Sequence, residues 1–153
     1  MMPFLLVSSM LSILIPMETL RFQWVYEQRY DYSCGAAALA SLISIYWETE
    51  IHEEELLEIL PNEDTPRADT TLLDLSRMVE SLGFEAAAFD VSFEALTAAI
   101  DVYGPVIVHL NQNDGHYVLV IDYRDGFLII GDPSAGGTAW TAARFKRLWS
   151  RVA

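Results

Sequence analysis

The sequence predicts an α+β fold in which N-terminal helices pack on a C-terminal antiparallel sheet. Apolar residues recur at helical spacing up to about residue 82, whereas apolar runs of strand length follow from residue 105. A chain of 153 residues can form one hydrophobic core, and 52% hydrophobic residues with 12% aromatics are typical of a packed globular protein. We therefore predict one folded domain over residues 18–153.

The first predicted helix, residues 36–47, begins with small residues and is apolar almost all round, which indicates a buried central helix. Pro61 ends the next helix, and Gly83 caps the one after it. A short helix follows Ser92, which serves as its N-cap. These further helices are predicted over residues 52–60, 71–82, 93–100 and 142–149.

The second half of the chain contains the predicted strands. Asp125 and Gly126 form a dipeptide typical of a tight hairpin turn between two of them. Pairing around that turn places His116 opposite the chain just past Asp132. The predicted strands cover residues 84–90, 105–110, 116–123 and 127–131.

Residues 1–17 are mostly apolar and carry no charged side chain. The segment is shorter than the roughly 18–20 residues of a membrane-spanning helix. It fits the apolar region of a secretory signal, although no Lys or Arg precedes it and no clear cleavage site follows it. We predict a signal peptide or membrane anchor, with possible membrane association, and keep a buried N-terminal element as the alternative.

The charge and the cysteine count exclude several classes of site. A net charge of −13 argues against binding of nucleic acid or anionic lipid by bulk electrostatics. The single cysteine permits no intrachain disulfide and no Cys-based zinc site, and the three histidines lack metal-ligand spacing. We therefore predict no metal and no cofactor. Of the histidines, His52 is predicted to be solvated and His109 to lie in the core or a cleft wall.

Cys34 lies where a thiolate is favoured, at the start of the buried helix. Exposed N–H groups and the positive end of the helix dipole favour an anionic sulfur there. Gly35, directly after it, leaves room for a substrate to approach the sulfur. The alternative is that Cys34 is a small buried hydrophobic residue, which is the usual role of a lone cysteine.

His116 and Asp132 are the candidate partners of that thiol. His116 begins a strand behind Gly115, so that it can face a cleft, and the predicted hairpin brings it near Asp132. A carboxylate in that place fixes the tautomer of the imidazole and stabilises its protonated form. Taken singly, His116 could be a loop-edge histidine, and Asp132 could simply start an Asp-Pro turn.

Three segments resemble cysteine peptidase family 39, the bacterial peptidases that process bacteriocins and other peptides with double-glycine leaders. Residues 28–42, QRYDYSCGAAALASL, are similar to the family's active-site segment, with a Gln six positions before Cys-Gly. Residues 115–120, GHYVLV, are similar to its histidine strand, and residues 132–136, DPSAG, to its aspartate turn. The likeness covers about residues 25–149.

The resemblance implies a papain-like cysteine peptidase fold and a role for each matching residue. Cys34 would be the nucleophile, His116 the general base and Asp132 the residue that orients the imidazole. Gln28 would donate to the oxyanion. Beside these residues, the substrate is expected to contact Tyr32, Gly35 and Gly115.

The expected activity is hydrolysis of a peptide bond in a protein or leader-peptide substrate, with Gly-Gly as one candidate cleavage point. The chain contains no Walker loop and no transporter helices, so it resembles a stand-alone, exported member. We expect it in the periplasm or at a membrane, with the cytoplasm as the alternative. Other interpretations are a catalytically silent module that binds leader peptides, another acyl transfer on the same residues, and a scaffold protein. The oligomeric state is not predicted.

Overall fold

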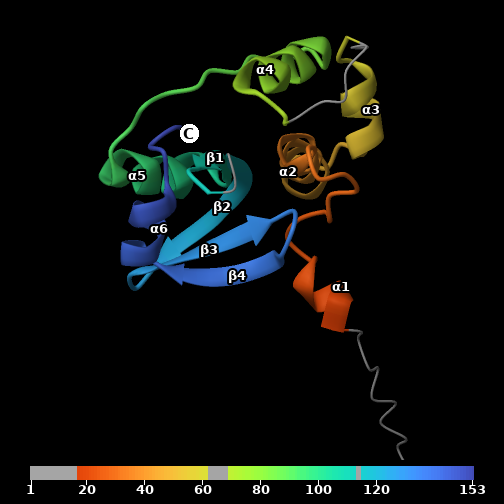
Figure 1. Cartoon of the computed structure of the whole chain (residues 1–153). Coiled ribbons are helices and arrows are strands. Elements are labelled where there is room, and N and C mark those ends of the chain that lie inside the picture. Colours follow the sequence, from red (N-terminus) through yellow and green to blue (C-terminus); the bar gives the residue numbers. More distant parts are fainter. Residues whose placement is uncertain (1–16, 62–68, 113–114) are drawn as a thin grey trace, which may run out of the picture.

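The computed structural model describes residues 17–61, 69–112 and 115–153 (Figure 1). The predicted signal or anchor segment, residues 1–17, therefore lies outside the described residues except for Met17. Within the described part of the chain, no helix has the length and apolar character needed to cross a membrane.

The chain forms helices first and a sheet afterwards, as predicted. Strands β1 to β4 form one antiparallel sheet in the order of the chain. The strands are β1 (Val106–Leu110), β2 (His116–Arg124), β3 (Phe127–Asp132) and β4 (Gly136–Thr141). The α-helices are α1 (Met17–Arg21), α2 (Cys34–Ser41), α3 (Glu53–Glu58), α4 (Leu72–Ser81), α5 (Phe93–Tyr103) and α6 (Ala142–Leu148), and a π-helical turn, η1 (Leu42–Tyr46), follows α2.

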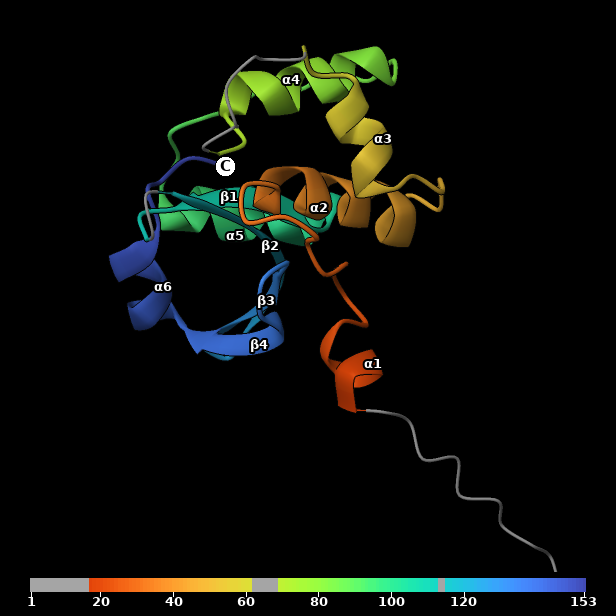
Figure 2. The ribbon, with the colours of Figure 1, turned by 45° about the vertical axis from the view of Figure 1, so that its right-hand side comes forward.

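The two faces of the sheet pack against different helices. Side chains alternate between the faces of a strand, so Val118 and Val120 point to the face covered by α5 and α6. Leu119 between them packs against Ala38 of α2 on the opposite face. Helices α3 and α4 lie beyond α2, on the side away from β3 and β4 (Figure 2). The molecule is thus layered, and α2 lies between helices α3 and α4 on one side and the sheet on the other.

Helix α2 is buried along its whole length, as its composition predicts. Its alanines allow the helix backbone to approach β2 closely, and Ala36, Ala37 and Ala38 are all 0% exposed. The predicted single helix over residues 36–47 differs in detail, because α2 begins at Cys34 and widens into η1 after Ser41. Cys34 is therefore the first helical residue.

The hairpin of β2 and β3 has the predicted register near its turn. Arg124 faces Phe127 and Tyr123 faces Leu128. A β-bulge at residue 121 then shifts the pairing by one, so that Val120 faces Ile130. The bulge leaves His116 and Asp132 at the same end of the sheet, which is where the site forms.

The observed sheet differs from the predicted one in two places. Residues 84–90 do not form a strand, because the only bridge there joins Asp90 to Val152 near the C-terminus. In contrast, β4 was not predicted. Its sequence, GGTAWT, has two glycines and weak apolar alternation, and it is held by pairing along the full length of β3.

Candidate active site

Cys34 lies at the wall of a polar cleft between the start of α2 and the ends of β2 and β3. The cleft has a volume of about 150 Å³, and its lining includes Gln28, Cys34, Gly115 and His116. Cys34 itself is 3% exposed. Of the three residues predicted to contact the substrate, Gly115 lines this cleft, whereas Tyr32 and Gly35 are not among the described residues that line it. The fold thus brings the nucleophile candidate and the histidine to one cavity.

His116 bridges Cys34 and Asp132. Its Nε2 lies 2.8 Å from Asp132 Oδ1, and both side chains are buried. The Cys34 side chain is close enough to the ring to raise the pKa of His116. Because Nε2 faces the carboxylate, Nδ1 is the nitrogen left for the sulfur. The fold therefore brings together three residues that the sequence places on separate elements.

The charges in this row stabilise a protonated imidazole. Burial lowers the pKa of His116, but the hydrogen bonds and charges of Asp132 and Cys34 outweigh burial and raise that pKa from 6.5 to about 9. Burial likewise raises the pKa of Asp132, while its hydrogen bond with His116 and the charge of the ring lower it overall. At neutral pH the ring is thus an imidazolium between a carboxylate and a sulfur.

Ser134 is a member of the site that the sequence reading missed. Its backbone N–H and its hydroxyl both donate to Asp132 Oδ1, each at 2.8 Å. The Asp-Pro-Ser sequence was the available signal, because an Asp side chain that starts a turn accepts from the residue two positions later. Asp132 consequently has both of the roles considered for it, as a turn starter and as the partner of His116.

Gln28 is held at the cleft wall by bonds from its side chain and its backbone. The side-chain Nε2 donates to the Tyr30 carbonyl at 2.8 Å, and the backbone N–H donates to the Pro133 carbonyl at 2.9 Å. The amide nitrogen carries a second hydrogen. Oε1 is buried and has no hydrogen-bond partner among the described residues. The bond to Pro133 joins the segment before α2 to the turn that follows Asp132.

Glu53 anchors the loop between Gln28 and Cys34, whereas an acidic run at a helix start, such as residues 53–55, is ordinarily solvated. The Glu53 side chain is buried and accepts from the Arg29 backbone N–H at 3.1 Å. Burial is the main cause that raises the pKa of Glu53, although hydrogen bonds from Ser33 and Arg29 oppose it. His52 beside it has an exposed side chain, as predicted.

Gly35 and Tyr32 both contact Thr70 and do not line the cleft. A Cβ on Gly35 would lie 2.7 Å from Thr70 Cγ2, so the lack of a side chain at this position makes room for Thr70. Thr70 in turn donates its hydroxyl to the Tyr32 carbonyl at 2.7 Å. Close packing against Thr70 therefore explains the glycine at position 35, in addition to the predicted access of substrate to the sulfur.

Gly115 lines the cleft and has a conformation that requires glycine. Its φ is +117°, and a Cβ on it would lie 2.7 Å from His109 Nε2. His109 is partly buried, and its Nδ1 lies 3.1 Å from Ser150 Oγ, in agreement with the predicted cleft-wall role. Burial lowers the pKa of His109. His109 thus supports the residue that precedes His116.

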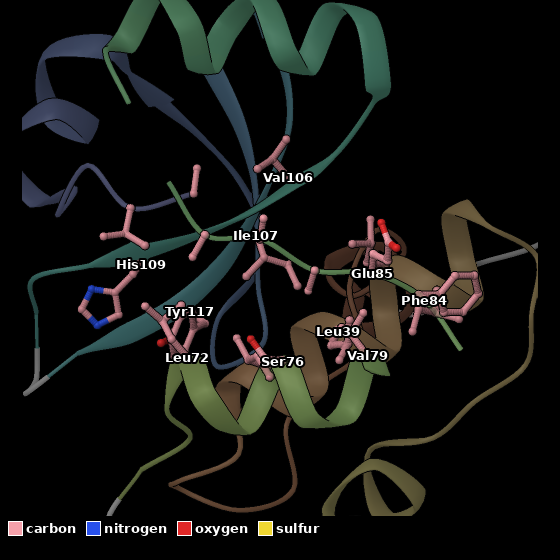
Figure 3. A pocket seen from close by; sticks show the side chains of 18 of the residues that line it. Leu39, Leu72, Ser76, Val79, Phe84, Glu85, Val106, Ile107, His109 and Tyr117 are labelled. Atoms are coloured by element: carbon pink, nitrogen blue, oxygen red, sulfur yellow. The ribbon is translucent and has the colours of Figure 1, made fainter. Parts of the chain in front are cut away.

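A second, apolar pocket of about 270 Å³ lies on the other side of His109, between α2, α4 and β1. Figure 3 shows Leu39, Val79 and Ile107 among its lining side chains, with His109 and Tyr117 at one end. Because Gly115 contacts His109, the pocket and the cleft are neighbours along β1 and β2. The described residues contain no group of three His, Cys, Asp or Glu suited to a metal ion.

Comparison with known proteins finds a protease among the relatives of this chain. The chain is 30% identical over 138 residues to the probable functional amyloid protease FapD of Pseudomonas fluorescens. That match covers 86% of this chain and 59% of the relative, so the chain spans less than two thirds of the relative's length.

Solved structures show the same fold. The peptidase domain of Streptococcus ComA, a bifunctional ABC transporter of a quorum-sensing pathway, is 28% identical with a TM-score of 0.71; the match covers 84% of this chain and 93% of that one. A double glycine motif protease from an AMS/PCAT transporter, in complex with its leader peptide, is 22% identical with a TM-score of 0.67, at 84% and 86% coverage, and supports the fold alone.

The sequence model of the Peptidase C39 family matches residues 21–153, which is most of the chain and includes every element from β1 to β4. The family resemblance seen in the sequence is therefore confirmed, and so is the papain-like α+β fold. This protein belongs to the peptidase C39 family.

Proposed function

We propose that this protein is a cysteine peptidase that cleaves leader peptides after a Gly-Gly pair, with Cys34 as nucleophile, His116 as general acid and base, and Asp132 as the residue that orients the imidazole. The observation that carries the proposal is that Cys34 and His116 line one cleft while the His116 ring is hydrogen-bonded to Asp132. A thiol beside an imidazolium is the arrangement that acyl transfer by cysteine requires.

The proposed reaction has two acyl-transfer steps. The Cys34 sulfur attacks the carbonyl carbon of the scissile bond, while His116 holds the proton that the thiol has given up. The resulting oxyanion accepts hydrogen bonds from the free N–H of the Gln28 amide and from the Cys34 backbone N–H. His116 then protonates the leaving amine. Water, deprotonated by His116, cleaves the thioester and releases the acid and the free thiol.

Two features support a leader peptide as substrate. The cleft beside Cys34 is small, at about 150 Å³, so glycines next to the scissile bond let the peptide backbone approach the sulfur closely. The apolar pocket beyond His109 can take an apolar side chain of the same peptide as it leaves the cleft past Gly115.

The test is cleavage of synthetic peptides that carry one Gly-Gly pair, with products identified by mass spectrometry. We expect a single cut after the second glycine. Replacing either glycine with valine should lower kcat/KM by about 10²-fold, since a branched side chain next to the scissile bond keeps the peptide backbone away from the sulfur. Equal cleavage of the valine peptides would overturn the specificity, and the absence of any cut in all peptides would overturn the peptidase proposal.

Gln28→Ala is expected to lower kcat by about 10²–10³-fold with little change in KM, because an oxyanion donor acts in the transition state. Gln23→Ala removes the same amide from an exposed position and serves as the matched control. Steady-state kinetics on the Gly-Gly peptide give the result. A rise in KM at constant kcat would assign Gln28 to substrate binding instead.

A further inference from the structure

Two carboxylates of the cleft take no part in the proposed reaction. Asp31 and Asp69 line the same cavity as Cys34, although they come from separate loops. The loops are joined next to these residues, because the Thr70 backbone N–H and hydroxyl donate to the Tyr32 carbonyl at 3.0 and 2.7 Å. The two acidic side chains are therefore held on connected backbone at the wall of one small cleft.

Neither carboxylate is neutralised within the described part of the protein. Asp31 and Asp69 have no ion pair and no hydrogen bond to any described residue. The arginine nearest in sequence to Asp31, Arg29, pairs instead with Glu54 at 2.7 Å. Among the described residues, the cleft lining contains no lysine or arginine, and its histidine, His116, is already paired with Asp132. The cleft consequently has an excess of negative charge.

The negative charge of Asp69 affects the pKa values of neighbouring side chains. The pKa of Tyr117 is raised to about 12, chiefly by burial, with the charges of Cys34 and Asp69 adding to the effect. The same carboxylate acts on His109, where it opposes the lowering caused by burial. A field that reaches these side chains from the cleft also acts on a substrate that lies in it.

We propose that Asp31 and Asp69 form a subsite for a Lys or Arg side chain of the substrate, close to the scissile bond. The inference rests on the proposed peptidase function and adds a substrate class to it, namely peptides with a basic residue beside the cleavage point. An unpaired carboxylate in a partly enclosed cavity favours a cation that completes its charge and hydrogen bonds. We propose a side-chain cation as the occupant because, among the described residues, these two carboxylates belong to no group of three side chains suited to a metal ion.

Charged thiol reagents test the subsite without any substrate. Cys34 is the only cysteine, so its rate of modification reports the cleft alone. We compare cationic trimethylammonium-ethyl methanethiosulfonate with anionic sulfonatoethyl methanethiosulfonate. The ratio of their rates should fall by about fivefold for each of Asp31→Asn and Asp69→Asn at low ionic strength, and by less at high salt. Asp101→Asn, which removes one exposed carboxylate from α5, should leave the ratio unchanged.

Peptide cleavage supplies the second test. In a set of Gly-Gly peptides with Lys, Gln or Glu placed in turn at each neighbouring position, one position should show a kcat/KM at least about tenfold higher for Lys than for Glu. The preference should shrink in Asp31→Asn and Asp69→Asn and persist in Asp101→Asn. Equal cleavage of Lys and Glu peptides at every position, with a reagent ratio that the variants do not change, would overturn the subsite while the peptidase function stands. A charge-dependent reagent ratio with no cleavage of any peptide would overturn the peptidase function instead.

Discussion

Cys34→Ala is expected to abolish peptide hydrolysis, with a loss of about 10⁴-fold or more in kcat, while the protein stays folded. The sulfur is the only thiol in the chain, so no other side chain can replace it in forming a thioester. The fold should survive because Cys34 is one small buried residue packed beside Ala36 and Leu39, and alanine occupies nearly the same volume. Losing the sulfur should cost about 1 kcal/mol in the free energy of unfolding.

The measurement pairs peptide cleavage with thermal unfolding of the same preparations. Cys34→Ser is the matched variant, since it keeps the shape of the side chain and a hydroxyl that His116 does not activate well. Both variants should be inactive with melting temperatures close to that of the parent. Activity retained in Cys34→Ala would contradict the role of the thiol, and inactivity accompanied by unfolding would reduce Cys34 to a structural residue.

His116→Ala is expected to lower both hydrolysis and the reactivity of Cys34 towards iodoacetamide. The pKa of His116 is about 9, so the ring is protonated at every pH below that value and favours the thiolate beside it. Alkylation of the parent should therefore stay rapid at pH 6. Without the imidazolium, the rate should follow a free thiol with a pKa of about 8.5 and fall by about 10²-fold at pH 6.

His52→Ala is the matched control for this experiment, because the His52 side chain is exposed just before α3 and does not line the cleft. Its alkylation profile should match that of the parent. Equal rates in the parent and in His116→Ala would show that the imidazolium does not activate the sulfur. Alkylation that begins only on unfolding would identify a buried structural cysteine, and would favour a module that binds leader peptides without cutting them.

The main residues of the candidate site could be predicted because each follows from local sequence. Cys34 stands at the start of a small-residue helix, and the hairpin at Asp125 and Gly126 brings His116 towards Asp132. The supporting contacts could not be predicted, because they join segments far apart in the chain. The burial of Glu53 under the Arg29 backbone is one such contact. The approach of Asp69 to the cleft is another.

The same limit explains the two errors in the sheet. Phe84, Ala86 and Ala88 alternate as a strand would, but the neighbouring C-terminal residues pair only with the end of that segment, at Phe89 and Asp90. Strand β4 has little strand propensity of its own and is held in place by β3. In both cases the presence of a partner decided the structure, and the partner lies elsewhere in the sequence.

The hydrogen bond from the Gln28 backbone N–H to the Pro133 carbonyl bears on when the candidate site forms during synthesis of the chain. It joins the first third of the chain to the last, and so does the contact between Cys34 and His116. Contacts of such long sequence separation form late in folding. A growing polypeptide that has exposed Cys34 therefore lacks the imidazole and the carboxylate of the candidate site until β3 and its following turn have been made. Until then the nascent chain carries the thiol alone.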